Sequence, residues 1–403
     1  MSNIDQLLAR GVIIPRPEAV VVEGVAPAAF EPGVAIHPGT TIVGAASRFG
    51  AGTSIGRAGG GYFRDVRAGR GVDLFGGYFD DCVLLDGVAL RGHAEVRGGT
   101  LLEEGVEAAH HVGFKMTIVL PFVMAGSLIN LCDALFSGGT SRKDHSEIGS
   151  CLALYNFTPW GDKFASLFGD VPRGVFLRSP RIFLGGQTQV VSPVKVGFGA
   201  VIPAGLAVRR SVGEGRMAGE RPEAVDTAFD PELYGGLAPK FALTAEYVGN
   251  LVALDLWYER VRVPAAGDEF ERALYREARV QIAAGIAERI KRLQAIVDRL
   301  PASRARHEQL LATAPDPALH ARRIAEHDAV ASSWESWRAG LGEARDAAAE
   351  LAGVALLERL AARLDGTGPW PSRLAALDDA EVARGSAALQ RVVDRHAFPL
   401  PAA

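Results

Sequence analysis

Hydrophobic residues recur with a period of six through the first half of the chain. Ten consecutive positions at this spacing are nonpolar or aromatic: Val66, Val72, Tyr78, Leu84, Leu90, Val96, Leu102, Ala108, Phe114 and Leu120. A later run has the same period: Leu184, Val190, Val196, Ile202 and Val208. An earlier fragment consists of Phe30, Ile36 and Ile42. Glycine is frequent around all three runs, so the repeating unit combines one apolar position with a turn.

A period of six fits neither an α-helix nor a flat strand pair alone. It fits a short strand and a turn repeated on three sides of a triangular prism, with about 18 residues in each coil. Every sixth residue then points inward and stacks on its equivalent one coil away, at about 4.8 Å. Glycine supplies the turn conformations that a Cβ would hinder. The pattern predicts a parallel β-helix of hexapeptide repeats over residues 30–210, and it resembles the left-handed β-helix family, whose coils commonly trimerise.

The pattern changes after residue 210. Residues 1–29 are a lead-in to the repeats, and residues 211–245 are typical of a linker because they contain many Pro and Gly. From residue 246 to 403, Gly becomes sparse while Ala, Arg, Glu and Leu dominate. One helical stripe has spacings of four and three residues and contains Ile286, Ile290, Leu293, Val297 and Leu300.

We expect Pro301 to end that helix, and further helices at 318–350, 350–364 and 377–395. The pattern in the second half of the chain therefore predicts an α-helical domain that packs on the β-helix or on a neighbouring chain.

Composition narrows the class of protein. Hydrophobic residues make up 48% of the chain and charged residues 22%, values typical of a soluble globular protein. The net charge of −4 gives no basic field that would attract nucleic acid or an anionic membrane. Cys82, Cys132 and Cys151 are too few for a disulfide framework and fit a reducing cytoplasm. The first ten residues lack the apolar core of a signal peptide, so we expect a cytoplasmic protein.

One uncharged stretch, residues 116–132, has the composition of a membrane span. It is at the short limit for a span, and Pro121 and Asn130 interrupt it. The period of six also continues through its first residues, which favours strands over a membrane helix.

Residues 97–205 resemble the acetyltransferase half of the bifunctional enzyme that makes UDP-N-acetylglucosamine. The similar segments are VRGGTLLEEGVEAAHHVGFK, AGSLINLCDALF, YNFTPWGDKF and FLGGQTQVVSPVKVGFGAVIPAG. The resemblance implies a sugar nucleotide or sugar phosphate as substrate, acetyl-CoA or another acyl-CoA as donor, and a homotrimer. Nothing resembles the Gly-rich loop of the pyrophosphorylase half, so uridylyl transfer is not implied. No cluster of metal ligands stands out, and we expect no metal.

Arg97 and Lys115 match the basic residues that bind the sugar nucleotide in that family. They are 18 residues apart, one full coil, and each directly follows an inward position. Their side chains should project from the same face, stacked one above the other. Two stacked cations repel each other unless an anion lies between them, as a diphosphate would. The alternative is a solvated pair bridged to Glu103 or Glu104.

The resemblance assigns a loop to the sugar and the carrier. Asn156 and Lys163 match that family's residues, whereas Phe157 stands in place of a tyrosine. Asn130 replaces another tyrosine and Glu147 an asparagine. An added carboxylate at Glu147 would repel a phosphate unless Arg or Lys neutralised it.

Small residues mark the expected acyl-CoA site. Ser150, Gly186 and Ala204 match positions at which that family's backbone meets acetyl-CoA. Small residues also belong at tight β-helix turns, so this signal supports both interpretations.

Ser127 is the main departure from the family, which has its general base, a histidine, at this position. A serine at neutral pH cannot accept a proton as imidazole does. N-acetylation is therefore either lost or rebuilt with another residue. The inserted segment SGGTSRKDHS offers His145 as a replacement acid or base, with His110 and His111 as weaker alternatives. Each of these histidines also fits a surface position.

Two hypotheses remain open from the sequence. The first is an acyltransferase-like enzyme that acts on a nucleotide sugar or a related phosphorylated amine. The second is a non-catalytic protein that binds a nucleotide sugar or serves as a scaffold, and Ser127 favours it. No nucleophile or metal motif supports an enzyme of another class.

Overall fold

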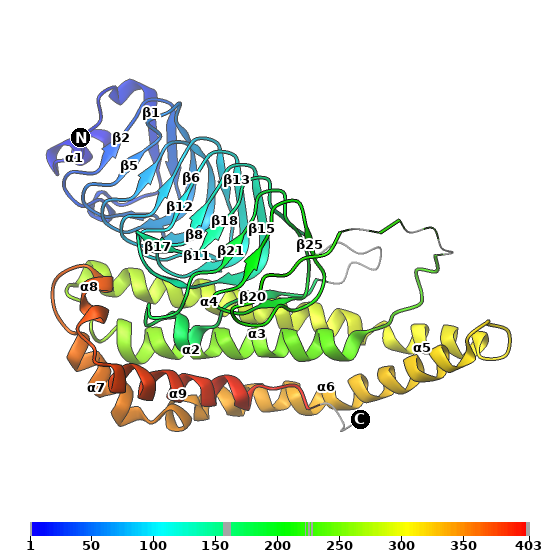
Figure 1. The fold of residues 1–403 in the computed structure, drawn as a ribbon. Helices are drawn as coiled ribbons and strands as arrows, with labels where there is room; N and C mark the ends of the chain where they lie inside the picture. The colour runs from blue at the N-terminus through cyan, green and yellow to red at the C-terminus, as the bar shows by residue number, and fades with distance from the viewer. Residues whose placement is uncertain (1, 156–162, 222, 225, 227–228, 400–403) are drawn as a thin grey trace.

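The computed structural model describes residues 2–155, 163–221, 223–224, 226 and 229–399. A parallel β-solenoid of about 10 turns occupies residues 20–208, and a helical region follows it (Figure 1). The solenoid is preceded by α1 (Asn3–Ala9), η1 (Pro17–Ala19) and η2 (Pro27–Ala29). The predicted fold class, repeats followed by helices, is confirmed.

Three faces form the prism, and parallel strands pair from coil to coil. The first face contains β2 (Ala35–Ile36), β5 (Ser54–Ile55), β7 (Asp73–Leu74), β9 (Ala89–Leu90), β12 (Glu107–Ala108), β14 (Met124–Ala125), β18 (Glu147–Ile148), β21 (Phe183–Leu184) and β24 (Val201–Ile202). The second face contains β1 (Val20–Glu23), β3 (Thr40–Val43), β10 (Ala94–Val96), β19 (Ala153–Tyr155), β22 (Gln189–Val191) and β25 (Ala207–Val208). The third face contains β4 (Arg48–Phe49), β11 (Thr100–Leu102), β20 (Ser166–Phe168) and β23 (Lys195–Val196). Four longer strands bend from the second face into the third: β6 (Gly61–Ala68), β8 (Gly77–Leu84), β13 (Val112–Val119) and β15 (Ile129–Phe136).

Of the ten positions from Val66 to Leu120 that the period of six predicts to point inward, eight lie in the core of the prism. The other two, Tyr78 and Leu120, do not. Tyr78 is 39% exposed, while its neighbour Phe79 is buried and stacks on Phe63 with ring centroids 4.8 Å apart. Leu120 is buried, but among the helices, and Val119 takes the inward place. The reason is that in these coils the next inward residue comes five residues after the last one, not six.

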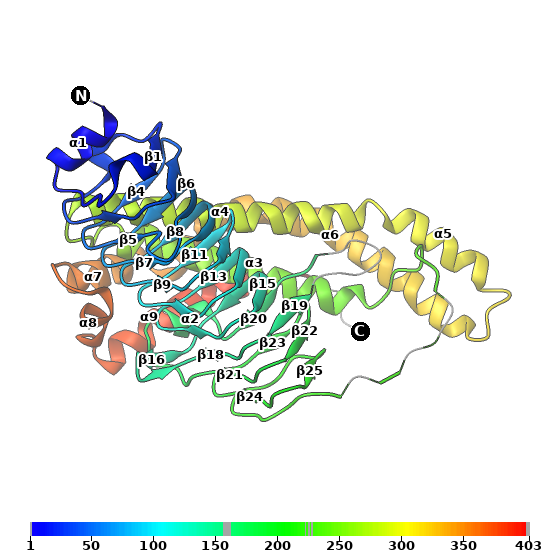
Figure 2. The same cartoon turned by 90° about the horizontal axis from the view of Figure 1, so that it is seen from above.

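The third face is apolar on its outer side as well, because helices cover it (Figure 2). Its outward residues share one buried cluster with the helices, and they include Val83, Leu101, Ile118, Leu135 and Leu167. The covering elements are α3 (Leu237–Trp257), η3 (Tyr258–Arg262) and α4 (Glu269–Val297). Burial on both sides explains why the strands of this face are continuously hydrophobic.

A second layer of helices packs beneath α3 and α4, with α6 and α9 its main members (Figure 1). The remaining elements are α5 (Leu300–Leu310), α6 (Pro317–Ala352), α7 (Val354–Leu364), α8 (Trp370–Ala375) and α9 (Asp379–Arg395). Aspartates cap three helices of this region: the side chains of Asp268, Asp316 and Asp378 accept hydrogen bonds from backbone N–H groups in the first turns of α4, α6 and α9.

Pro301 does not end the helix that carries the apolar stripe. That helix, α4, ends at Val297, and Pro301 lies in the first turn of α5. A proline is tolerated there because the first N–H groups of a helix have no intrahelical acceptor.

Among the described residues, no helix combines the length and the apolar character that crossing a membrane requires. The uncharged stretch 116–132 instead runs through β13, β14 and β15 of the solenoid.

Candidate functional site

Arg97 and Lys115 lie one above the other where the second face turns into the third. The residues before them, Val96 and Phe114, are register partners on β10 and β13. The Arg97 N–H donates to the Phe114 carbonyl at 2.9 Å, which continues the pairing by one residue. The two cationic side chains therefore leave the prism on adjacent coils, as their spacing predicts.

Neither glutamate expected as a bridge reaches this pair. Glu103 and Glu104 are buried beside Arg262 at a different corner. Arg97 instead forms an ion pair with Glu95 of its own strand, with Nε and Oε1 3.2 Å apart.

Cys132 continues the same column, since its register partner is Lys115. Burial raises the pKa of the Cys132 thiol, and the adjacent Asp133 carboxylate raises it further. Arg97, Lys115 and Lys163 act in the opposite direction through their positive charges. Three of the residues predicted to bind substrate thus lie near enough to Cys132 for their charges to act on its thiol.

Helix α4 fixes the segment that carries Lys163. Arg289 is fully buried; its guanidinium pairs with Asp133 and donates to the Lys163 carbonyl at 2.9 Å. The position of this lysine therefore depends on the contact between the helical domain and the solenoid.

The other substrate-binding predictions fall in different places. Asn130 is exposed on the second face, between Gly113 and Ala153 of the neighbouring strands. Glu147 is exposed on the first face, between Met124 and Phe183, and so lies apart from the three cations. Asn156 and Phe157 lie outside the described residues.

The small residues expected at the acyl-CoA site form a column at the corner between the first and second faces. Backbone hydrogen bonds of 2.8 to 2.9 Å join Cys151 to Ser127, Gln187 to Ser150 and Gly205 to Gly186. Ala204 follows in the next coil. Close packing explains the small side chains, because a Cβ at Gly185 would lie 2.4 Å from the Ala204 nitrogen.

Ser127 has a hydrogen-bonding partner in His110, which the sequence suggested only as a weaker alternative to His145. The Ser127 hydroxyl lies 3.1 Å from Nδ1 of His110, which is exposed on the preceding coil. The Ser127 N–H also donates to the Ser150 hydroxyl at 3.1 Å. The signal for this pair was present in the sequence, because His110 precedes Ser127 by 17 residues, about one coil.

His145 lies at the opposite end of the first face. It belongs to a hairpin of β16 (Gly139–Ser141) and β17 (Asp144–His145), and its Nδ1 is 2.9 Å from the Arg142 carbonyl. The extended residues from His145 to Ser150 span about 16 Å at roughly 3.3 Å each. Within this chain, His145 and Ser127 therefore do not share one site.

Comparison with known proteins adds little to this geometry. No family model matches the chain. Among solved structures, the chain is similar to the polysialic acid O-acetyltransferase OatWY. The identity is 8%, the match covers 54% of this chain and 90% of that chain, and the TM-score is 0.16. A likeness at this level carries no argument about fold or activity, so both rest on the residues described above.

Proposed function

We propose that the second face binds a sugar nucleotide or a sugar phosphate and that the protein is an acyltransferase-like enzyme with an acyl-CoA donor. The observation that carries the proposal is the stack of Arg97 and Lys115 on adjacent coils, and the charge of Lys163 adds to it at Cys132. Stacked cations are stabilised by an anion placed between them, and charge-assisted hydrogen bonds to phosphate are among the stronger polar contacts.

The reaction would be direct attack of an amine or hydroxyl of the sugar on the thioester carbonyl. A new C–N or C–O bond forms, the C–S bond breaks, and the nucleophile's proton leaves with a base while the CoA sulfur takes up a proton. Positioning of the two substrates supplies most of the acceleration. The donor would lie along the corner column of Ser150, Gly186 and Ala204.

His110 is the base that the geometry favours, because its hydrogen bond to Ser127 places an imidazole at the corner where the resembled family has its histidine. His145 remains the alternative that the sequence suggested, and it would have to act from the far end of the first face.

The second candidate function is binding without catalysis, and Ser127 in place of a histidine favours it. The same cations would then hold the ligand, and the helical domain would recruit a partner.

Calorimetric titration with UDP-N-acetylglucosamine tests the binding site. Arg97→Ala with Lys115→Ala should weaken binding by about a hundredfold or more, since each charged hydrogen bond contributes about 1.5–3 kcal/mol. Arg57→Ala with Arg91→Ala is the matched control, because it removes the same charge from exposed positions elsewhere on the solenoid. Equal affinity of wild type and the first double variant would refute the phosphate site.

Release of free thiol from acetyl-CoA in the presence of glucosamine 1-phosphate tests the chemistry. Turnover supports the enzyme, whereas binding of the nucleotide sugar without thiol release supports the second candidate for this substrate.

A homotrimer belongs to the same proposal. Helices cover the third face, so the first and second faces are the ones open to other copies of the chain. Size-exclusion chromatography with light scattering should give three times the monomer mass, and a monomer mass would contradict it.

A further inference from the structure

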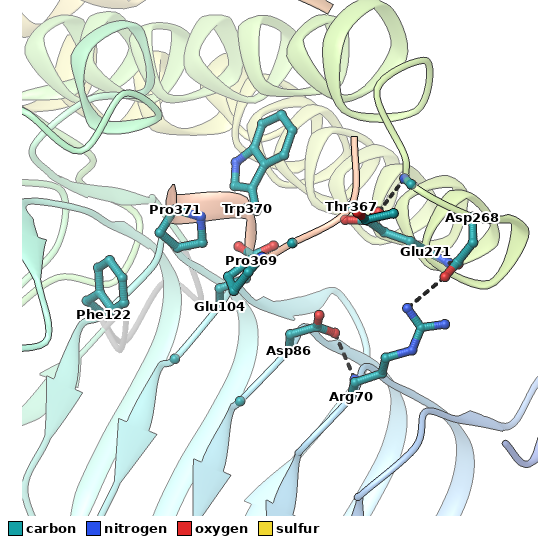
Figure 3. Close-up of a pocket in the computed structure, with 14 residues that line it drawn as sticks. Arg70, Asp86, Glu104, Phe122, Asp268, Glu271, Thr367, Pro369, Trp370 and Pro371 are labelled. Atoms are coloured by element: carbon teal, nitrogen blue, oxygen red, sulfur yellow. Dashed lines mark hydrogen bonds and ion pairs between the residues drawn. The ribbon is translucent and has the colours of Figure 1, made fainter. Parts of the chain in front are cut away.

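A cavity of about 460 Å³ lies between the solenoid and the helical domain, at the corner where the third face turns into the first (Figure 3). The solenoid contributes Asp86 and Glu104 from adjacent coils. The helical domain contributes Asp268, Glu271 and the segment 367–371. None of these residues takes part in the nucleotide-sugar site proposed above.

Glu104 is the unusual member of the cavity wall. The residue is only 6% exposed, and one of its carboxylate oxygens pairs with Arg262. The other oxygen, Oε2, is buried and has no hydrogen-bond partner. An unpaired buried oxygen of a charged group costs several kcal/mol, and the residue that carries this one forms part of the cavity wall.

The carboxylates around the cavity are only partly neutralised by cations. Glu271 pairs with Arg373, and Asp268 with Arg70 at 2.8 Å. Asp86 accepts the Arg70 backbone N–H at 2.7 Å and has no ion-pair partner in the part of the chain that the structure describes. The cavity wall thus carries four carboxylates, those of Asp86, Glu104, Asp268 and Glu271, and one guanidinium, that of Arg70, so negative charge is in excess there.

The pKa values of both carboxyls are raised, mainly by burial and further by neighbouring carboxylates. Burial raises the pKa of Glu104 to about 7; the Glu103 carboxylate adds to the rise and Arg262 opposes it. Desolvation raises the pKa of Asp86 to about 6, and Glu104 and Glu271 contribute to the rise. Asp86 is the exposed member of the pair, at the rim, and Glu104 is the buried one.

The wall also has an apolar part, formed by Phe122, Pro369, Trp370 and Pro371, and Glu104 lies next to it (Figure 3). No group of three His, Cys, Asp or Glu residues close enough to hold a metal ion occurs among the described residues. A carboxylate pair beside an apolar wall matches an ammonium group on a hydrophobic body better than a bare metal ion.

We propose that this cavity is a second binding site, for a small organic cation whose ammonium group lies against Asp86 and Glu104 and whose apolar body contacts Phe122 and the prolines. Trp370 already stacks with Arg262 and Arg373, at 4.5 and 4.9 Å from its ring centre. The ring faces are therefore already occupied by guanidinium groups, and in this proposal the carboxylates bind the ammonium group of the ligand.

Binding of the cation should release protons, because it favours the ionised forms of both carboxyls. Affinity should then rise between about pH 6 and about pH 8. The titratable and charged groups that act on the two carboxyls are Arg70, Glu103, Tyr258, Arg262, Glu271 and Tyr275.

Calorimetric titration of the full chain with phenethylamine tests the proposal, with the uncharged 2-phenylethanol as the chemical control. We expect saturable binding of the amine, with the alcohol at least about tenfold weaker. Asp86→Asn should weaken amine binding about tenfold or more while keeping the Arg262 network intact. Glu104→Gln should do the same if it folds, and Asp73→Asn on the first face is the control for charge.

The opposite results would overturn the proposal. They are an alcohol that binds as tightly as the amine, an Asp86→Asn variant with unchanged affinity, or no saturable binding at millimolar amine. Displacement of the amine by Mg²⁺ at equal concentration would also overturn it, in favour of a metal site.

Discussion

Arg289 of α4 forms a buried ion pair with Asp133, which holds a left-handed conformation (φ 55°) at the corner between the second and third faces. Gln281, two turns earlier, contacts the same corner: it accepts the Gly99 N–H at 2.8 Å and donates to Asp81 at 3.1 Å. One helix thus satisfies polar groups on several coils, which fixes how the helical domain sits on the solenoid.

Removing the Arg289 guanidinium should destabilise the protein strongly. Arg289→Met leaves Asp133 buried without its cation, and breaking a buried pair in this way costs about 3–5 kcal/mol. The measurement is the denaturant midpoint followed by circular dichroism. Arg292→Met removes a more exposed i,i+4 pair with Glu288 on the same helix and should cost at most about 1 kcal/mol. Equal costs for the two variants would contradict the docking role of Arg289.

Two adjacent aromatic residues on β8 should differ sharply in their contribution to stability. Phe79 stacks on Phe63 inside the prism, so Phe79→Ala should cost about 3–5 kcal/mol through the cavity that it leaves. Tyr78 stacks on Tyr62 on the outside, with ring centroids 5.7 Å apart, and Tyr78→Ala should cost about 0.5–1.5 kcal/mol. Chemical unfolding of both variants checks the difference, and a larger cost at Tyr78 would show that the inward residue is misassigned.

Leu128 should be a site where glycine stabilises the protein. The residue is 56% exposed and has a φ of 57°, a conformation that costs a residue with a Cβ about 1–2 kcal/mol. Glycine relieves that cost and gives up about 0.5–1 kcal/mol in the unfolded chain, so Leu128→Gly should stabilise by up to about 1 kcal/mol. Thermal unfolding measures the change. Val21→Gly, at an exposed strand position, is the control and should destabilise.

If the protein releases thiol from acetyl-CoA, His110→Ala should reduce kcat by about 10²–10⁴, as loss of a general base does. His145→Ala should leave kcat within about twofold, because the first face separates it from Ser127. A pH profile distinguishes the proposed role from a structural one, since the acidic limb should disappear in His110→Ala. The reverse pattern, with activity lost only in His145→Ala, would restore His145 as the base.

Three buried histidines should each destabilise the helical domain in mild acid, against the opposite effect of Glu104 and Asp86, whose raised pKa values stabilise the folded state there. Burial lowers the pKa of His307, His327 and His396 in the folded state. Below about pH 6.5 the unfolded chain binds protons that the folded chain does not, so the free energy of unfolding falls with falling pH by up to about 1.4 kcal/mol per pH unit for each histidine.

The check is Tm measured at about pH 7.5 and about pH 5.5. His327→Gln should show a smaller fall in Tm than wild type, and His93→Gln, an exposed solenoid histidine, should show the same fall as wild type. An identical fall in wild type and His327→Gln would exclude His327 as a source of the acid sensitivity.

The chain's own pattern was sufficient for the solenoid and for the stacking of Arg97 on Lys115. Both follow from the repeat, because a residue's position within the repeat decides whether its side chain points inward or outward and which residue lies next to it in the adjacent coil. The period of six gave the wrong inward residue at Tyr78 and Leu120. There the next inward position comes after five residues, and the sequence has no signal that distinguishes such a step from one of six.

Only the tertiary structure decided which polar groups meet. Glu103 and Glu104 are close to Arg97 in sequence, yet they pair with Arg262, more than 150 residues later. The cavity with Asp86 and Glu104 exists only because helices close over the third face. Contacts of this kind depend on how two separately formed elements pack, and no local period in the chain records that packing.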